Sequence, residues 1–166
     1  LDHRTRAGGV YVAPPGRTFV QPDQSKAESH WLAAWARDPR YLEAHEGVVD
    51  THALVAHWIW PEVDWPEDPK DWGGFAKKVS FTKLLGLPYS IPDDNIRQVS
   101  KKVQHGVGRM QSAAGVATTL QCSRPVAERV LSRFHEELPT TMQFLATVAQ
   151  KVANAEVIHF GRHAPQ

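Results

Sequence analysis

The sequence predicts an α+β fold that is mostly helical, with a short antiparallel β element at its start. Residues 10–13 and 18–21 are short β-prone runs on either side of Pro14, Pro15 and Gly16. Such a pattern predicts two strands joined by a turn. From residue 27 onward, apolar residues recur mostly at helical spacing. A chain of 166 residues is also long enough to bury one ordinary core.

The middle of the chain predicts two helices followed by a loop. Residues 27–37 carry Ala27, Trp31 and Ala34 at helical spacing, and residues 49–60 form the second helix, which Pro61 ends. Residues 61–75 contain three prolines and a glycine pair, so they are predicted to be a loop.

The last third predicts three more helices. Asp93 and Asp94 follow a proline, which is typical of a helix start, and that helix should run from about residue 95 towards 115. Residues 123–125 open the next helix, Pro139 breaks it, and a last amphipathic helix runs through residues 142–152. Residues 156–160 then begin a strand or an extended exit.

Composition limits the class of protein. Hydrophobic residues make up 42% and charged residues 22%, which excludes a disordered chain. The single cysteine, Cys122, excludes an intrachain disulfide and favours a reducing, cytoplasmic location. No apolar stretch is long enough to span a membrane, so we expect no membrane partner.

Charge is unevenly distributed along the chain, although its net value is only +1. Acidic residues crowd residues 62–71, whereas residues 95–127 contain none and carry five Lys or Arg side chains. An acid-free basic run of this length favours an anionic partner.

The predicted helix at 95–115 has two distinct faces. Its apolar residues lie within about 80° of one another at 100° per residue. Opposite them, within about 120°, lie Arg97, Lys101, His105 and Arg109 at intervals of four. Gly108 lies within this basic face, and helical glycines cost roughly 1 kcal/mol each relative to alanine. The pattern fits a solvated basic face with glycines that permit tight packing. It equally fits a triphosphate site, where Arg and Lys donate to phosphate oxygens.

Three ordered motifs resemble those of family A DNA polymerases. The run Asp23-Gln24-Ser25-Lys26-Ala27-Glu28 resembles motif A, which follows a strand. The run Arg97-x-x-x-Lys101-x-x-x-His105-Gly106 resembles motif B. Between them, Asp50-Thr51-His52 resembles the family's Asp-x-His at a helix start. The resemblance extends from Val12 to Arg162 and is closer to phage-encoded members than to bacterial repair enzymes.

The resemblance implies an incomplete polymerase domain. Residues 1–60 would belong to the palm, residues 61–155 to the fingers, and residues 156–166 to the return towards the palm. The parent enzyme would add deoxynucleoside triphosphates to a primer 3′-end by two-metal-ion nucleotidyl transfer. Its partners would be primer-template DNA, deoxynucleoside triphosphates and the remainder of the polymerase chain.

The resemblance also implies residue roles. Asp23 would bind two Mg²⁺ ions, and the backbone carbonyl of Gln24 would be a further metal ligand. Glu28 would lie under the sugar and help to exclude a 2′-hydroxyl. Further along the chain, His52 and Arg97 would hold the phosphates, Lys101 would hold them and assist catalysis, and His105 would stack on the nucleotide. Gly108 and Arg109 would lie on the template side.

Several residues depart from the family pattern. Gln24, Lys26 and His30 replace an aromatic residue, a glutamine and an arginine, and Arg109 replaces a tyrosine. The family's second catalytic aspartate, in a His-Asp-Glu hairpin, is absent, so we expect this chain alone to be inactive.

Each single residue also has a plainer interpretation: Asp23 as a helix cap and Glu28 as a surface carboxylate. The spacing of His52 and His57 disfavours a zinc pair. The alternative function is a non-catalytic helical nucleic-acid-binding module.

Overall fold

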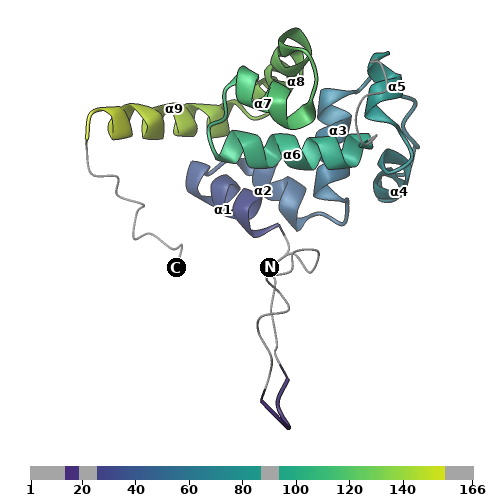
Figure 1. Ribbon diagram of the computed structural model, residues 1–166, viewed down its shortest axis with the longest axis horizontal. Coiled ribbons are helices and arrows are strands. Elements are labelled where there is room, and N and C mark those ends of the chain that lie inside the picture. Colours follow the sequence, from purple (N-terminus) through teal and green to yellow (C-terminus); the bar gives the residue numbers. More distant parts are fainter. Residues whose placement is uncertain (1–13, 19–25, 87–93, 156–166) are drawn as a thin grey trace.

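The structure, a computed structural model, describes residues 14–18, 26–86 and 94–155. In these ranges the chain forms helices joined by short loops (Figure 1). None of these helices is long and apolar enough to cross a membrane. In chain order they are α1 (Ala27–Ala36), α2 (Pro39–Glu46), α3 (Thr51–Ile59), the 3-10 helix η2 (Pro69–Asp71), α4 (Trp72–Ala76), α5 (Phe81–Leu85), α6 (Ile96–Gly108), α7 (Ala113–Leu120), α8 (Arg124–Glu137) and α9 (Pro139–Ala153).

The predicted α+β class is wrong, because the described residues contain helices and no strand. Their one β feature is an isolated antiparallel bridge between Ser80 and Asn95. The predicted turn is present: Arg17 N–H donates to Pro14 O at 3.0 Å. Of the two predicted strands only Thr18 is described, and it is coil; residues 10–13 and 19–21 lie outside the described ranges. A lone two-stranded hairpin buries too little apolar surface to be stable, whereas these helices bury one another.

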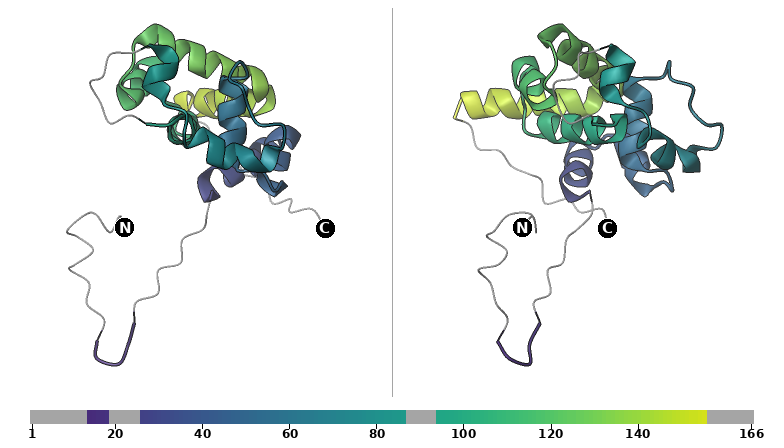
Figure 2. Two further views of the ribbon diagram at one scale, coloured as in Figure 1. Left: turned by 90° about the vertical axis from the view of Figure 1, so that its right-hand side faces the viewer. Right: turned by 45° about the vertical axis from the view of Figure 1, so that its right-hand side comes forward.

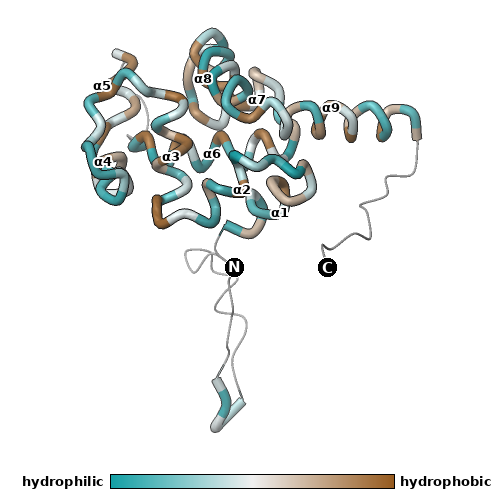
Figure 3. Tube along the Cα trace, turned by 180° about the vertical axis from the view of Figure 1, so that it is seen from behind, coloured by the Kyte–Doolittle hydropathy of each residue, from teal (hydrophilic) through white to brown (hydrophobic). Residues whose placement is uncertain are grey.

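Helix α6 lies across the middle of the molecule (Figure 1). It packs most extensively on α3 and also contacts α1 and α7, while α8 packs on α7 and α3. The right-hand view of Figure 2 again shows α9 projecting away from the other helices. Hydrophobic and hydrophilic turns alternate along α9 (Figure 3), as expected for a helix that packs on one side only. The core is therefore built around the α3–α6 pair.

The apolar stripe predicted for residues 95–115 is confirmed within α6, but its last two members, Met110 and Ala114, are exposed. Ile96, Val99, Val103 and Val107 are each at most 4% exposed. Asn95 caps the helix, because its Oδ1 accepts from Gln98 N–H at 3.0 Å.

The helix predicted over residues 95–115 is in fact two helices. Helix α6 ends at Gly108, and Met110 adopts a left-handed conformation with φ of 54°. Gln111 N–H then donates back to Gly106 O at 2.9 Å, which closes the end of α6. Ser112 caps α7 through its hydroxyl oxygen, which accepts from Gly115 N–H at 3.3 Å. The basic face thus stops at the end of α6.

Asp38 joins the start of α2 to the start of α9. It is 2% exposed, and its Oδ1 caps α2 by accepting from Tyr41 N–H at 3.2 Å. Its Oδ2 accepts from Thr141 N–H at 3.0 Å and from Thr141 Oγ1 at 2.8 Å, near the start of α9. Because these bonds are buried, their loss would leave donors of Thr141 unsatisfied.

We expect Asp38→Ala to lower the free energy of unfolding by about 2–4 kcal/mol, since one helix cap and two buried hydrogen bonds are lost together. Urea denaturation followed by circular dichroism measures this change. Asp71→Ala is the matched control, because Asp71 is exposed and makes no side-chain capping bond. An equal effect of the two substitutions would contradict the role given to Asp38.

Candidate functional site

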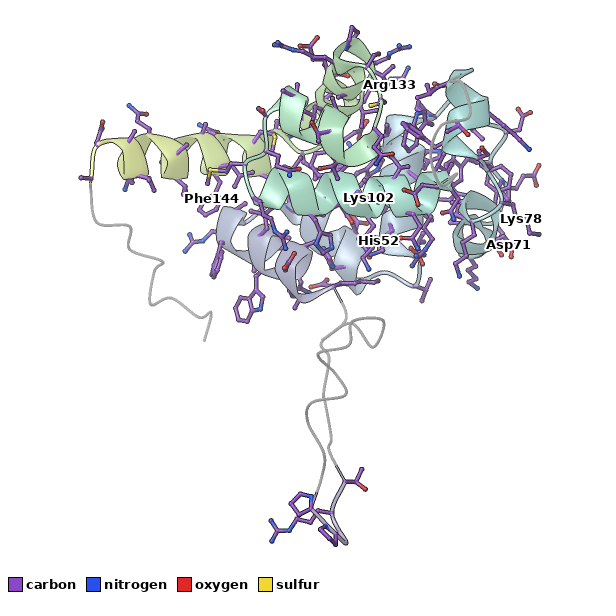
Figure 4. The ribbon with its side chains drawn as sticks, viewed as in Figure 1. His52, Asp71, Lys78, Lys102, Arg133 and Phe144 are labelled. Carbon is purple, nitrogen blue, oxygen red and sulfur yellow. The ribbon has the colours of Figure 1, made fainter. Side chains whose placement is uncertain are left out.

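The structure brings most of the predicted site residues to three neighbouring helices. Glu28 lies on α1 and His52 on α3, while Arg97, Lys101, His105 and Gly108 lie on α6 and Arg109 caps its end. Figure 4 shows the side chain of His52 close to α6. The predicted metal ligands Asp23 and Gln24 lie outside the described residues.

The described residues do not form a metal site. Within residues 14–18, 26–86 and 94–155, no group of three or more His, Cys, Asp or Glu side chains converges to hold an ion. The prediction of magnesium therefore rests on Asp23 and Gln24 alone.

Asp50 links the start of α3 to α6. Its Oδ1 accepts from His52 N–H at 3.0 Å and from Ala53 N–H at 3.1 Å, which caps α3. Its Oδ2 accepts from Arg97 Nε at 2.9 Å and Nη2 at 2.7 Å. Burial alone would raise the pKa of Asp50, but the hydrogen bonds from Arg97 and Ala53 N–H outweigh it and hold this pKa below its usual value. Arg97 is consequently fixed in place by a carboxylate.

Helix α6 contacts His52 at two points, its backbone carbonyl and its ring. Its carbonyl oxygen accepts from Ser100 Oγ at 2.5 Å, and its Nδ1 lies 2.5 Å from Gln104 Oε1. The ring is buried, at 7% exposure. Burial lowers the pKa of His52, and although the bond to Gln104 opposes this, the charges of Arg97 and Lys101 lower it further. His52 is therefore neutral near pH 7.

We define the α3–α6 seam as this set of polar contacts between Asp50 and His52 on one side and Arg97, Ser100 and Gln104 on the other. The three α6 residues recur at spacings of three and four, so they lie on one face of that helix. Among these residues, Asp50 was named in the sequence only as part of the Asp50-Thr51-His52 motif. Ser100 and Gln104 were not predicted as site residues.

Glu28, His105 and Arg109 form an exposed cluster. His105 Nδ1 lies 2.8 Å from Glu28 Oε2, and Arg109 Nη2 lies 3.4 Å from Glu28 Oε1. The side chain of Glu28 is 62% exposed and that of Arg109 is 68% exposed. The structure thus places Glu28, which is predicted to lie under the sugar, against the ring of His105, which is predicted to stack on the nucleotide.

Lys101 differs from its neighbours because it is exposed and its ammonium group makes no ion pair with a described residue. It lines a hollow of about 360 Å³ together with Lys102, His105 and Arg109. Lys102, by contrast, pairs with Asp94. The surface of α6 around Lys101 therefore offers positive charge to an anion.

A second, larger hollow adjoins the first. It measures about 480 Å³ and shares His105 and Arg109 with the basic hollow. Trp31 and Trp35 of α1 line it, as does Phe144, which lies on the side of α9 that faces α1 (Figure 4). The basic and the apolar hollow thus meet at the end of α6.

The two glycines of α6 have different surroundings. A Cβ at Gly106 would lie 2.6 Å from Gln111 Oε1, the end of an exposed side chain that would have to move aside. A Cβ at Gly108 would meet only Leu32 Cδ2 at 3.8 Å, which is an ordinary contact. Internal packing does not require Gly108, which lines the apolar hollow described above.

Behind the seam lies a partly buried polar cluster that the motifs did not reveal. Lys26 Nζ donates to Thr51 Oγ1 at 2.8 Å, and the ring of His45 lies 5.2 Å from that of Tyr41 and 5.3 Å from that of His30. The buried Nε2 atom of His45 has no hydrogen-bond partner among the described residues. Burial lowers the pKa of His45 to about 4, with smaller effects of the charges on His30, Lys26 and His52.

This pKa predicts a loss of stability in mild acid. The folded chain binds the His45 proton less tightly than the unfolded chain, in which the pKa is 6.5. The contribution of neutral His45 to stability is therefore complete above pH 6.5 and is lost as pH falls from 6.5 to about 4. We expect His45→Phe, which keeps a ring against Tyr41, to lose stability less steeply over this range in urea denaturation. An unchanged slope would contradict this assignment.

Comparison with known proteins gives a distant similarity to DNA polymerase I of two bacteria. The chain is 26% identical to DNA polymerase I of Chloroflexus aurantiacus over 136 residues, which cover 82% of this chain and 12% of that protein. It is 23% identical to DNA polymerase I of Rhizobium leguminosarum over 156 residues, which cover 92% of this chain and 13% of that protein. No protein-family model matches. The chain thus spans about one eighth of the length of these relatives, and the similarity supports its resemblance to part of a family A DNA polymerase.

Proposed function

We propose that this chain is the part of a DNA polymerase that binds the incoming deoxynucleoside triphosphate. The observation that carries the proposal is the α3–α6 seam, which fixes Arg97 and His52 beside the exposed Lys101. Guanidinium, imidazolium and ammonium groups are suitable donors to phosphate oxygens. The distant similarity to bacterial DNA polymerase I supports the same function.

Each cation contributes differently under this proposal. Arg97 is held by Asp50 through two hydrogen bonds, so it presents its remaining N–H groups at a fixed position. Lys101 is unpaired among the described residues and supplies a charge that follows the phosphates. His52 contributes a third donor from α3 once its ring is protonated. A site with one fixed and one adaptable cation accommodates a flexible triphosphate.

The Glu28 cluster is proposed to receive the sugar. Glu28 pairs with His105 and Arg109 on the exposed end of α6, so the carboxylate is held where His105 would meet the nucleotide. Gly108 and Arg109, beside the apolar hollow, would contact the template strand. An exposed ion pair of this kind is worth little, at about 0–1 kcal/mol, so a nucleotide can displace it.

The remaining assignments follow from the same proposal. Residues 1–60 would contribute to the palm of a phage-type polymerase, residues 61–155 to the fingers and residues 156–166 to the return. Asp23 and the carbonyl of Gln24 would hold Mg²⁺ together with a carboxylate outside this sequence.

Lys101→Ala tests the proposal directly. We expect the purified chain to bind a deoxynucleoside triphosphate, and we expect the substitution to weaken this binding about tenfold, or roughly 1.4 kcal/mol, because one charge-assisted contact is lost. Fluorescence titration or calorimetry measures the affinity. Lys77→Ala, which removes an exposed lysine just after α4, is the control. No detectable binding by the wild-type chain would overturn the proposal.

The basic hollow also favours a second function, a nucleic-acid-binding module without catalysis. Such a module would bind single-stranded DNA with an affinity that falls steeply with salt, but would not bind a free triphosphate. Under the polymerase proposal the chain binds the triphosphate, yet it does not extend a primer with Mg²⁺ because the second aspartate is missing. A primer-extension assay is the check, and extension by the purified chain would show that the expected inactivity is wrong.

A further inference from the structure

We propose that Gln104 positions His52 so that the ring carries its single proton on Nδ1, and that a triphosphate binding to His52 therefore takes up one proton from solvent. This inference rests on the proposed function, because it is that function that assigns His52 to the phosphates. Gln104 touches no substrate in this scheme and acts only through His52.

The orientation of the Gln104 amide decides which ring nitrogen carries the proton. His52 Nδ1 lies 2.5 Å from Gln104 Oε1, and an amide oxygen only accepts hydrogen bonds. The hydrogen in this contact must therefore belong to Nδ1. A neutral imidazole has only one N–H, so Nε2 of His52 then carries a lone pair and no hydrogen. Gln104 is 3% exposed and His52 is 7% exposed, so water does not readily replace this bond.

The surroundings of the Gln104 amide nitrogen fit the same orientation of the amide group. Its Nε2 is buried without a hydrogen-bond partner in the part of the chain that the structure describes, as is the hydroxyl of Tyr41. That hydroxyl lies towards Gln104 and Ser29 without reaching hydrogen-bond geometry with either. With the amide nitrogen facing Tyr41, the amide oxygen faces His52. The reverse orientation would instead have Gln104 donate to Nδ1, which would move the ring proton to Nε2.

An ionised phosphate oxygen only accepts hydrogen bonds, so above the second pKa of a phosphate group, about 6, it cannot bond to a bare Nε2. His52 becomes a donor to phosphate only when Nε2 gains a proton from solvent while Nδ1 keeps its own. The product is an imidazolium with both N–H groups engaged, one to Gln104 and one to the ligand. The charge balance is one proton taken up for each triphosphate bound.

The charged groups around His52 favour this sequence of events. Arg97 and Lys101 of α6 face it, Asp50 precedes it at the start of α3, and His45 of α2 lies behind it. Lys26 of α1 reaches the neighbouring Thr51. In the free chain the cations and burial keep the ring neutral. A triphosphate adds several negative charges beside Arg97 and Lys101, which favours the protonated ring.

Nitrogen NMR of the histidine rings tests the first half of the proposal without a ligand. We expect His52 of the free chain, at a pH where it is neutral, to show Nδ1 protonated and Nε2 bare. Gln104→Leu keeps the side-chain size and removes the acceptor, so it should shift the ring towards the Nε2–H form. Gln98→Leu removes an exposed amide from the same helix and should leave the ring unchanged. A wild-type ring with its proton on Nε2 would overturn the proposal.

Calorimetry tests the second half. Titration of dATP, with a chelator to remove metal ions, in two buffers of different ionisation enthalpy gives the protons taken up on binding. The titrations are run well above the second pKa of a phosphate group, about 6, where the γ-phosphate is ionised, so differences between variants report His52. We expect wild type and Gln98→Leu to take up as much as one proton more than His52→Gln. Gln104→Leu should bind dATP without this extra uptake, and Gln104→Glu should also lose it because its carboxylate already holds the ring protonated.

The outcomes separate this inference from the proposed function. Binding of dATP with equal proton uptake by wild type and His52→Gln would sink the inference and leave the nucleotide site standing. Absence of dATP binding by the wild-type chain would overturn both. Thermal melting by circular dichroism, run on each variant, shows whether a loss of uptake comes from unfolding; if Gln104→Leu fails to fold, Gln104→Glu and the free-chain NMR spectrum still decide the matter.

Discussion

The contact between Asp50 and Arg97 is the interaction on which the rest of the site depends. One carboxylate caps α3 through Oδ1 and holds the guanidinium group of α6 through Oδ2. The apolar stripe of α6 supplies burial, but burial alone does not specify how far one helix slides along another, because it has no direction. Polar contacts with defined geometry, such as those of Asp50, do specify this position. Helix α4 packs behind this point, where a Cβ at Gly73 would lie 3.1 Å from the Cβ of Asp50.

The sequence predicted the long helices well because they carry a repeated signal. Helices α1, α3, α8 and α9 lie within a few residues of the predicted ranges, since several turns of apolar spacing mark each of them. The short helices α2, α4 and α5 were not predicted, because one or two turns are too few for a period to emerge. The division of α6 from α7 was missed for another reason: Met110 adopts a positive φ, which its side chain does not favour. The β element was predicted from local preference alone, and no strand forms among the described residues.

Local sequence patterns were likewise insufficient to predict the contacts of the candidate site. Helical spacing places Arg97, Lys101 and His105 on one face, and the structure confirms that they share α6. Spacing does not say which residues of other helices meet that face. Glu28 meets His105 from α1, and His52 meets Gln104 from α3, across separations that no local pattern encodes. Gln104 is the clearest case, because in sequence it is one polar residue between a core valine and a motif histidine.

The two ion pairs at the ends of α6 differ in what a ligand can do to them. The Asp50–Arg97 pair is partly buried and makes two hydrogen bonds, so its rupture would leave a charge in a desolvated place. The Glu28 contacts are exposed and thus cost little to break. A nucleotide that approaches α6 would therefore leave the first pair intact and rearrange the second. Under the proposed function, the phosphate end of the site is rigid before binding, whereas the sugar end forms its final contacts only when the nucleotide is present.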